Sequence, residues 1–191
     1  MPFSRPRALT AGLTIALLGT ALAGCAAEPA SGSSMVQDAP VAAVPSPTAA
    51  TASASLTADL QYLIEEEKLA HDVYVTLGDA WGLRVFEQIA ASETSHQDAV
   101  AGLLETYQIP DPRQDGVGEF SDPALQSLYD TLVAQGLASR EGAIQAGITI
   151  EQTDIADLNA RVSTAPADVE RVLESLLRGS ENHLAAFERQ A

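Results

Sequence analysis

Apolar residues between positions 56 and 191 recur every three or four positions, which is the period of an amphipathic α-helix. That stretch shows none of the strict apolar–polar alternation that is typical of half-buried strands. The pattern predicts four long helices, over residues 57–77, 83–107, 139–162 and 166–189, and a shorter one over residues 121–136. Thr57 is the expected cap of the first helix. The predicted fold class is all-α.

The predicted connections differ in length, and this indicates the topology. Only a few residues join the first long helix to the second and the third to the fourth, which predicts two antiparallel hairpins. About thirty residues, including the short helix, join the second long helix to the third. A single long crossover between two helical hairpins is the ferritin-like variant of the four-helix bundle, and we therefore expect that fold.

The first 25 residues have the features of a targeting segment. Arg5 and Arg7 precede an apolar run over residues 9–23, which is short and rich in small residues. The run ends in Leu-Ala-Gly-Cys25, which looks like the lipobox of bacterial lipoproteins, where the cysteine is lipidated. An ordinary secretory signal with a chance cysteine is the alternative. Because Cys25 is the only cysteine, no intramolecular disulfide is expected.

Residues 26–55 are mostly Ala, Ser, Pro and Thr and show no helical or strand period. Such a composition predicts a disordered tether, and residues 56–191 are then one folded domain. Together with the lipid anchor at Cys25, this places the expected domain on the extracytoplasmic face of the cell membrane, with the membrane itself as a partner.

The chain carries 26 acidic and 10 basic residues, a formal charge of −16, and Lys68 is its only lysine. Nucleic acid and anionic lipid surfaces are therefore poor partners for the folded domain, whereas cations are favoured. A solvated acidic surface is the simpler explanation of the same balance. The residue pattern predicts no serine-hydrolase triad, phosphate-binding loop or nucleic-acid patch.

Five ionisable residues fall on the apolar stripes of the four long helices. They are Glu67 on the first, Glu93 and His96 on the second, Glu151 on the third and His183 on the fourth. A charged group in a helical core costs several kcal/mol unless it is compensated. Carboxylates with imidazoles and few nearby bases predict a bound cation, and the Glu-x-x-His spacing places Glu93 and His96 on one side of a helix. Mutual pairing or buried water is the alternative.

Other acidic residues lie outside or beside these stripes. Asp154 is at the edge of the inner face and is a candidate for a further oxygen ligand, as is Glu66 beside Glu67. The helical pattern directs Glu174 and Glu181 away from the core. The simplest interpretation of Glu65, Glu66 and Asp72 is a solvated face with help from Lys68, and His71 is expected to face the surface.

Four stretches carry a family resemblance. They are EEKLAHDVY at 66–74, IAASETSH at 89–96, IEQTDIADL at 150–158 and RGSENHLAAF at 178–187. The chain resembles the ferritin-like superfamily of rubrerythrin and ferritin. More narrowly, residues 56–191 resemble the bacterial ferritin-like domain-of-unknown-function family DUF2202, here as a lipoprotein.

The resemblance implies a site for two metal ions. In the superfamily pattern two helices each give a Glu and two each give a Glu-x-x-His. Glu67, Glu93, His96, Glu151 and His183 match this pattern, and the spacing to Ala70 and Tyr74 favours Glu67 over Glu66. Ser180 stands where the sixth ligand, a Glu, is expected. Tyr74 is expected either to hydrogen-bond a ligand carboxylate or to be an ordinary core tyrosine.

The expected cofactor is a pair of divalent metals, iron or alternatively manganese, because carboxylates with imidazoles suit these ions. Glu67 and Glu151 are the expected bridging carboxylates. The expected activity is oxidoreductase chemistry on O2, peroxide or Fe(II). Two alternatives stay open: a non-catalytic metal-binding or sensing bundle, which Ser180 favours, and a structural or partner-binding bundle without metal.

Overall fold

The computed structural model of the protein describes residues 52–191. The predicted signal segment with Cys25, and the predicted tether up to residue 51, lie outside the described residues. All regular structure between residues 52 and 191 is helical, in agreement with the predicted all-α class. Within this part of the chain no helix combines the length and the apolar character needed to cross a membrane.

The structure has five helices over residues 52–191. They are α1 (Ala54–Trp81), α2 (Arg84–Tyr107), α3 (Pro123–Ala138), α4 (Arg140–Val162) and α5 (Ala167–Glu188). The first begins earlier than predicted, because the Ser53 hydroxyl, rather than that of Thr57, accepts the N–H of Leu56 at 3.1 Å. It also ends later, at Gly82, whose φ of 62° suits a residue without a side chain. As predicted, Ser139 begins α4, with its hydroxyl accepting the N–H of Gly142.

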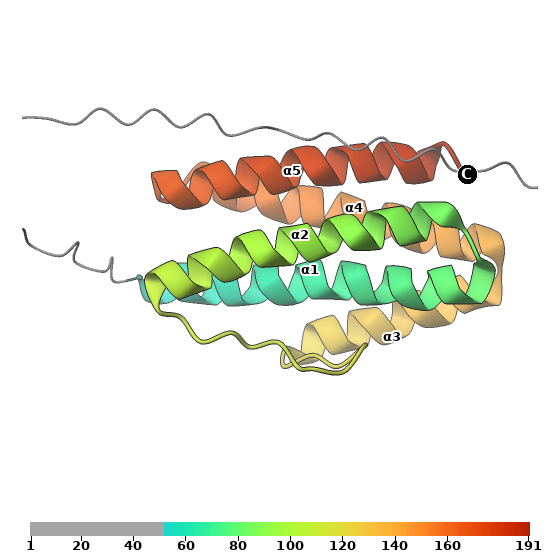
Figure 1. Cartoon of the computed structure of the whole chain (residues 1–191), viewed down its shortest axis with the longest axis horizontal. Coiled ribbons are helices and arrows are strands. Elements are labelled where there is room, and N and C mark those ends of the chain that lie inside the picture. The colour runs from blue at the N-terminus through green and yellow to red at the C-terminus, as the bar shows by residue number, and fades with distance from the viewer. Residues whose placement is uncertain (1–51) are drawn as a thin grey trace, which may run out of the picture. The chain divides into compact units, whose positions relative to one another are not determined.

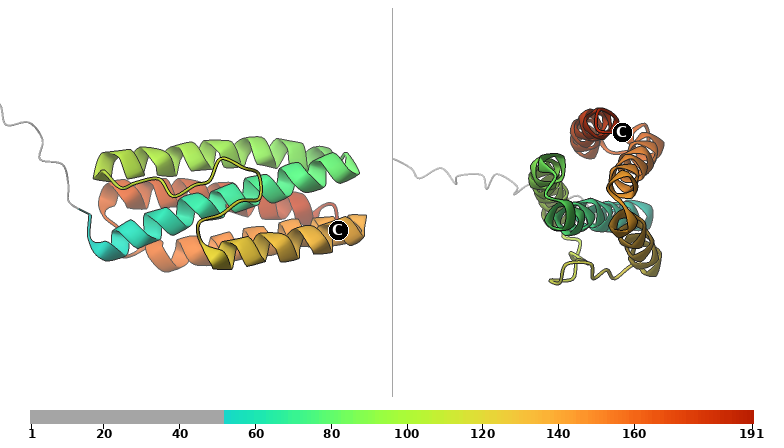
Figure 2. Two further views of the ribbon diagram at one scale, coloured as in Figure 1. Left: turned by 90° about the horizontal axis from the view of Figure 1, so that it is seen from below. Right: turned by 90° about the vertical axis from the view of Figure 1, so that its right-hand side faces the viewer.

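The four long helices form two hairpins that pack against each other (Figure 1). Helix α1 lies beside α2, α4 lies beside α5, and the hairpins meet through α1 against α4 and α2 against α5. The segment between α2 and α3, residues 108–122, is called the crossover below. The crossover and α3 return along the length of the bundle, so that α2 and α4 run in the same direction (Figure 1). The end view shows α3 outside the four long helices, next to α1 and α4 (Figure 2).

The core consists of two apolar clusters with a polar layer between them. One cluster contains Leu60, Val100, Leu158 and Leu173, and the other contains Tyr74, Phe86, Ile144 and Phe187. On each long helix the buried polar residues that face the interior of the bundle fall between the two clusters. The layer consists of Glu66, Glu67, Glu93, His96, Glu151, Asp154, Ser180 and His183. Apolar packing on both sides therefore fixes the height of this layer and limits its contact with water.

The outer face of α1 is covered, and this corrects one expectation. Glu65, Lys68 and Asp72 are buried rather than solvated. The Lys68 ammonium donates to the Asp72 carboxylate and to Gly116 O, and the Glu65 carboxylate accepts the N–H of Ser121 at 2.5 Å. The crossover thus folds back over α1 and is fastened there by charged groups. These contacts satisfy the carbonyl of Gly116 and the N–H of Ser121, two backbone groups of the crossover.

Candidate metal centre

The polar layer brings together the five residues that the sequence singled out. Glu67 comes from α1, Glu93 and His96 from α2, Glu151 from α4 and His183 from α5, and all five are buried. Glu93, His96 and His183 each present a ligand atom within 4.8 Å of the others, a spacing at which they can hold one metal ion. The helical wheel therefore predicted correctly which side chains turn inward.

Glu93 lies between the two histidines. Its Oε2 is 2.8 Å from Nδ1 of His96, and its Oε1 is 2.9 Å from Nδ1 of His183. Glu67 Oε2 approaches the same His96 nitrogen at 3.2 Å, and Glu151 Oε2 approaches the His183 nitrogen at 3.6 Å. The carboxylate that contacts both histidines is Glu93, because α2 faces α1 and α5 at once. The bridging of two metal ions by Glu67 and Glu151 stays a prediction.

The far sides of both imidazole rings are fixed by residues that sequence analysis missed. Nε2 of His183 lies 3.0 Å from the hydroxyl of Ser92, which directly precedes Glu93. Gly179 lies against the His96 ring, where a Cβ would come within 2.7 Å of Cε1 and closer still to Nε2. Both rings therefore turn Nδ1 toward the carboxylates, since Nε2 is occupied or blocked. A glycine inside an otherwise regular helix was the available signal for Gly179.

Tyr74 contacts the layer from the apolar cluster beside it. Its side chain is fully buried, and its hydroxyl donates to Oε1 of Glu151 at 2.6 Å. The ring packs against Phe86 and Phe187, with centroids at 5.8 and 5.2 Å. This hydrogen bond fixes one oxygen of Glu151 and leaves the other for His183, which agrees with the first of the two roles expected for Tyr74.

Asp154 and Ser180 form a second buried pair in the layer. The Ser180 hydroxyl donates to Oδ2 of Asp154 at 2.5 Å and lies 3.0 Å from the carbonyl of Leu176. Asp154 lies one turn after Glu151 on α4 and is 5% exposed. The residue expected at the edge of the inner face is therefore fully within the polar layer.

The contacts among these groups set their protonation. Burial opposes the ionisation of Glu93, but the adjacent imidazoles of His183 and His96 lower its pKa to about 2. Burial acts against the imidazolium forms, yet the carboxylates raise the pKa of His96 to about 11 and of His183 to about 9. These raised pKa values favour the imidazolium forms, which compensate the buried negative charge. A metal ion would have to replace those protons.

The layer also contains groups that internal pairing leaves unsatisfied. Five buried side-chain atoms have no hydrogen-bond partner within residues 52–191: Glu66 Oε2, Glu67 Oε1, Glu93 Oε1, Asp154 Oδ1 and His183 Nδ1. His183 Nδ1 and Glu93 Oε1 are close but not aligned for a hydrogen bond. Two ligands of one ion, each about 2.1 Å from it, are typically about 3 Å apart. Oxygen and imidazole donors at these separations could hold a metal ion.

The other acidic residues divide between the layer and the surface. Glu174 and Glu181 are exposed, as predicted. Glu66 is buried, so the expectation of a solvated side chain is wrong. Burial and the neighbouring Asp154 and Asp157 raise the pKa of Glu66 to about 9. His71 is partly buried, and its Nδ1 lies 2.9 Å from an oxygen of Asp72 on the outer face of α1.

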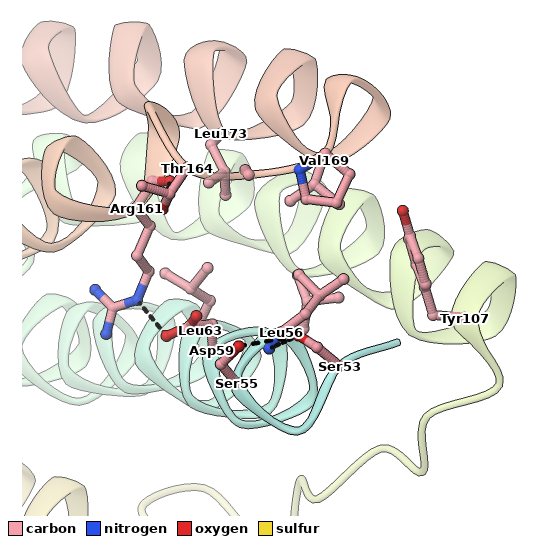
Figure 3. A pocket seen from close by; sticks show the side chains of 13 residues that line it. Ser53, Ser55, Leu56, Asp59, Leu63, Tyr107, Arg161, Thr164, Val169 and Leu173 are labelled. Carbon is pink, nitrogen blue, oxygen red and sulfur yellow. Dashed lines mark hydrogen bonds and ion pairs between the residues drawn. The ribbon is translucent and has the colours of Figure 1, made fainter. Parts of the chain in front are cut away.

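A cavity of 570 Å³ lies at the end of the bundle where α1 begins and includes none of the polar-layer residues. Leu56, Leu63 and Leu173 give it an apolar lining (Figure 3). The charged groups at its rim are paired, since Nε of Arg161 donates to Asp59 at 3.2 Å (Figure 3). Size alone would favour this cavity as a binding site, but the convergent and unsatisfied polar atoms are in the layer.

Comparison with known proteins is consistent with the extent of the helical domain. The family described as "Uncharacterized protein domain (DUF2202)" matches residues 57–191. The uncharacterized protein MJ0754 of Methanocaldococcus jannaschii is 50% identical over 127 residues, which cover 65% of this chain and 69% of that protein. The crystal structure of hypothetical protein MJ0754 from Methanococcus jannaschii DSM 2661 superposes with a TM-score of 0.72 at 43% identity. That match covers 78% of this chain and 85% of the solved chain.

Proposed function

The chain belongs to the DUF2202 family, and from this premise we propose that it is a ferritin-like protein that binds a pair of divalent metal ions. The observation that carries the proposal is the position of Glu93 between His96 and His183. The layer has two halves, one around His96 and one around His183. The Glu67 carboxylate contacts His96, and the Glu151 carboxylate contacts His183. Each half then offers an imidazole, a carboxylate of its own and a share of Glu93.

Residues around the layer hold the proposed ligands in fixed orientations. Tyr74 holds Glu151, and Ser92 occupies Nε2 of His183. Gly179 leaves room for the His96 ring. The two apolar clusters exclude water from above and below, which strengthens electrostatic attraction between the carboxylates and a cation. Such fixed supporting contacts commonly change metal affinity by 10- to 100-fold.

The reaction class that suits this site is oxidation of Fe(II) by peroxide or O2. Two Fe(II) ions, held by the carboxylates and imidazoles of the layer, would supply the two electrons that reduce peroxide. Two protons would be taken up, so that one peroxide would give two waters. The chain supplies carboxylates that stabilise the higher charge of Fe(III), together with imidazoles that release their protons when metal binds.

Peroxide consumption by the Fe(II)-loaded full-length protein tests this proposal. We expect Fe(II)-dependent turnover that is lost in Glu93→Gln and kept in Glu181→Gln, which changes an exposed carboxylate on α5 in the same way. Metal binding without turnover would instead indicate a non-catalytic binding or sensing bundle. Failure to bind any metal would indicate a structural bundle, although the unpartnered atoms within residues 52–191 argue against that alternative.

The location of the protein is part of the proposal. The Leu-Ala-Gly-Cys25 sequence after an apolar run supports a lipid anchor at Cys25, with the residues between Cys25 and α1 as a tether. The helical domain would then act on the extracytoplasmic face of the membrane, on small oxidants or Fe(II). The acidic balance of the whole chain, 26 acids to 10 bases, favours cations over nucleic acid as partners.

A further inference from the structure

The two Glu/His helices of the layer are not equivalent. On α2, Glu93 stands three residues before His96, and both side chains face the layer. On α5 the position three residues before His183 is occupied by Ser180. The Ser180 side chain is only 1% exposed, so this position also points inward, but it brings a hydroxyl where α2 brings a carboxylate. The His183 side of the layer is therefore one carboxylate short on α5.

A carboxylate from the neighbouring helix reaches this place. Asp154 of α4 directs Oδ2 to the Ser180 hydroxyl at 2.5 Å. Its other oxygen, Oδ1, is buried and lacks a hydrogen-bond partner among the described residues. The Ser180 hydroxyl also lies 3.0 Å from the carbonyl of Leu176, so two contacts hold its oxygen in place. One oxygen of Asp154 is thus anchored while the other is free to bind a ligand.

The free oxygen lies in the same polar layer as the other ligands. Asp154 is one turn after Glu151 on α4, and Ser180, which holds it, is one turn before His183 on α5. Both side chains are buried. A buried carboxylate with one unsatisfied oxygen is costly unless a cation or proton compensates it.

We infer that Asp154 is a metal ligand that replaces the carboxylate missing from α5, and that Ser180 is the positioning residue that holds it. This inference rests on the proposed function, because it assigns a sixth ligand to the same pair of metal ions. In this chain the carboxylate comes from Asp154 on α4 and not from α5, and the Ser180 hydroxyl on α5 orients it. Ser180 then contributes to the site by orienting Asp154, although it is not itself a ligand.

Anaerobic titration of the metal-free full-length protein with Fe(II) tests this assignment, with bound iron counted after rapid desalting. Wild type is expected to bind two equivalents. Asp154→Asn keeps the size of the side chain but is expected to weaken one equivalent by at least tenfold, in line with loss of a ligand or its support. Exchange of the two roles, Asp154→Ser with Ser180→Glu, is expected to restore two equivalents. Glu181→Gln, an exposed change beside Ser180, should leave both in place.

The outcomes separate this inference from the proposed function. Two tight equivalents in both wild type and Asp154→Asn would overturn the role of Asp154 and leave the metal pair standing. No iron in wild type would overturn both. Circular dichroism reports whether each variant folds. If Asp154→Asn does not fold, the exchanged variant decides, because a folded exchanged protein that binds only one equivalent contradicts the relocation.

Discussion

Gly179 on α5 makes room for the imidazole of His96 on α2. A Cβ at position 179 would lie 2.7 Å from Cε1 of His96 and closer still to Nε2, well inside van der Waals contact. The His96 ring therefore rests directly against the α5 backbone, and this contact turns Nδ1 toward Glu93 and Glu67. A residue without a side chain thus determines which nitrogen faces the polar layer.

Gly179→Ala is expected to displace His96 and to lower metal affinity by tenfold or more. Because the ring has to move within a packed core, the free energy of unfolding should fall by about 1–3 kcal/mol. Gly102→Ala is the matched control, since a Cβ there meets nothing within 4 Å and lies in the interior of α2. That change should stabilise the protein by about 0.4–1 kcal/mol. Equal effects of the two substitutions on metal binding would contradict the role of Gly179.

Tyr74→Phe removes the hydrogen bond to Glu151 while keeping the ring that packs on Phe86 and Phe187. It leaves a buried carboxylate oxygen without a donor, which costs about 1–3 kcal/mol of stability. Urea unfolding of the metal-free protein measures this cost. Metal affinity is expected to fall by about 10- to 100-fold because Glu151 loses its orientation. Unchanged affinity would make Tyr74 an ordinary core residue.

The contacts of Asp72 on the outer face of α1 predict a dependence of stability on pH. Burial acts to raise the pKa of Asp72, but hydrogen bonds from His71, Lys68 and the N–H of Gly118 lower it below its ordinary value of 3.8. The stabilisation is therefore complete above the unfolded value and is lost as pH falls through the lower, folded value. Below about pH 4, protonation of Asp72 should weaken its contacts with Lys68 and Gly118 and so lower the stability of the protein.

Asp72→Asn tests this origin of the acid sensitivity. The variant should be less stable than wild type at neutral pH, and the difference should shrink as the pH falls below about 4, because wild type loses the same contribution. Asp79→Asn, at an exposed position of the same helix, serves as control. A stability difference that stays constant between neutral and acidic pH would assign the effect to packing instead of charge.

Cys25→Ala is expected to release the protein from membranes in a bacterial host, because the proposed lipid anchor is lost. Cell fractionation followed by immunoblotting measures the distribution. Conversion of another residue of the leader, Ser4→Ala, controls for general effects on export. Persistent membrane association of the cysteine variant would contradict lipidation at this position.

The inward side chains were predictable from the sequence because helical periodicity is local. Glu93 and His96 lie three positions apart in an apolar stripe, and their direction follows from the geometry of one helix. The same reasoning was wrong for Glu65 because its partner, Ser121, is 56 positions away in the crossover. A wheel shows which face is apolar but not what covers a polar face. It likewise placed Asp154 only at the edge of the core, since Ser180 reaches it from another helix.

The shared role of Glu93 was not predictable for a related reason. Sequence spacing pairs Glu93 with His96, but the contact with His183 depends on how α2 and α5 are rotated against each other. That rotation is fixed by packing of the two apolar clusters and by the absence of a side chain at Gly179. These are long-range contacts that a single helical pattern does not contain.

The central claim is that Glu93 joins two metal positions, one at each histidine. Crystals of the full-length protein soaked in Mn(II) test it most directly, through an anomalous difference map recorded at the manganese absorption edge. The account predicts two peaks in the polar layer, both in contact with Glu93, one bound by Nδ1 of His96 and the other by Nδ1 of His183. A map without peaks in the layer, with both imidazoles still paired to Glu93, would contradict it.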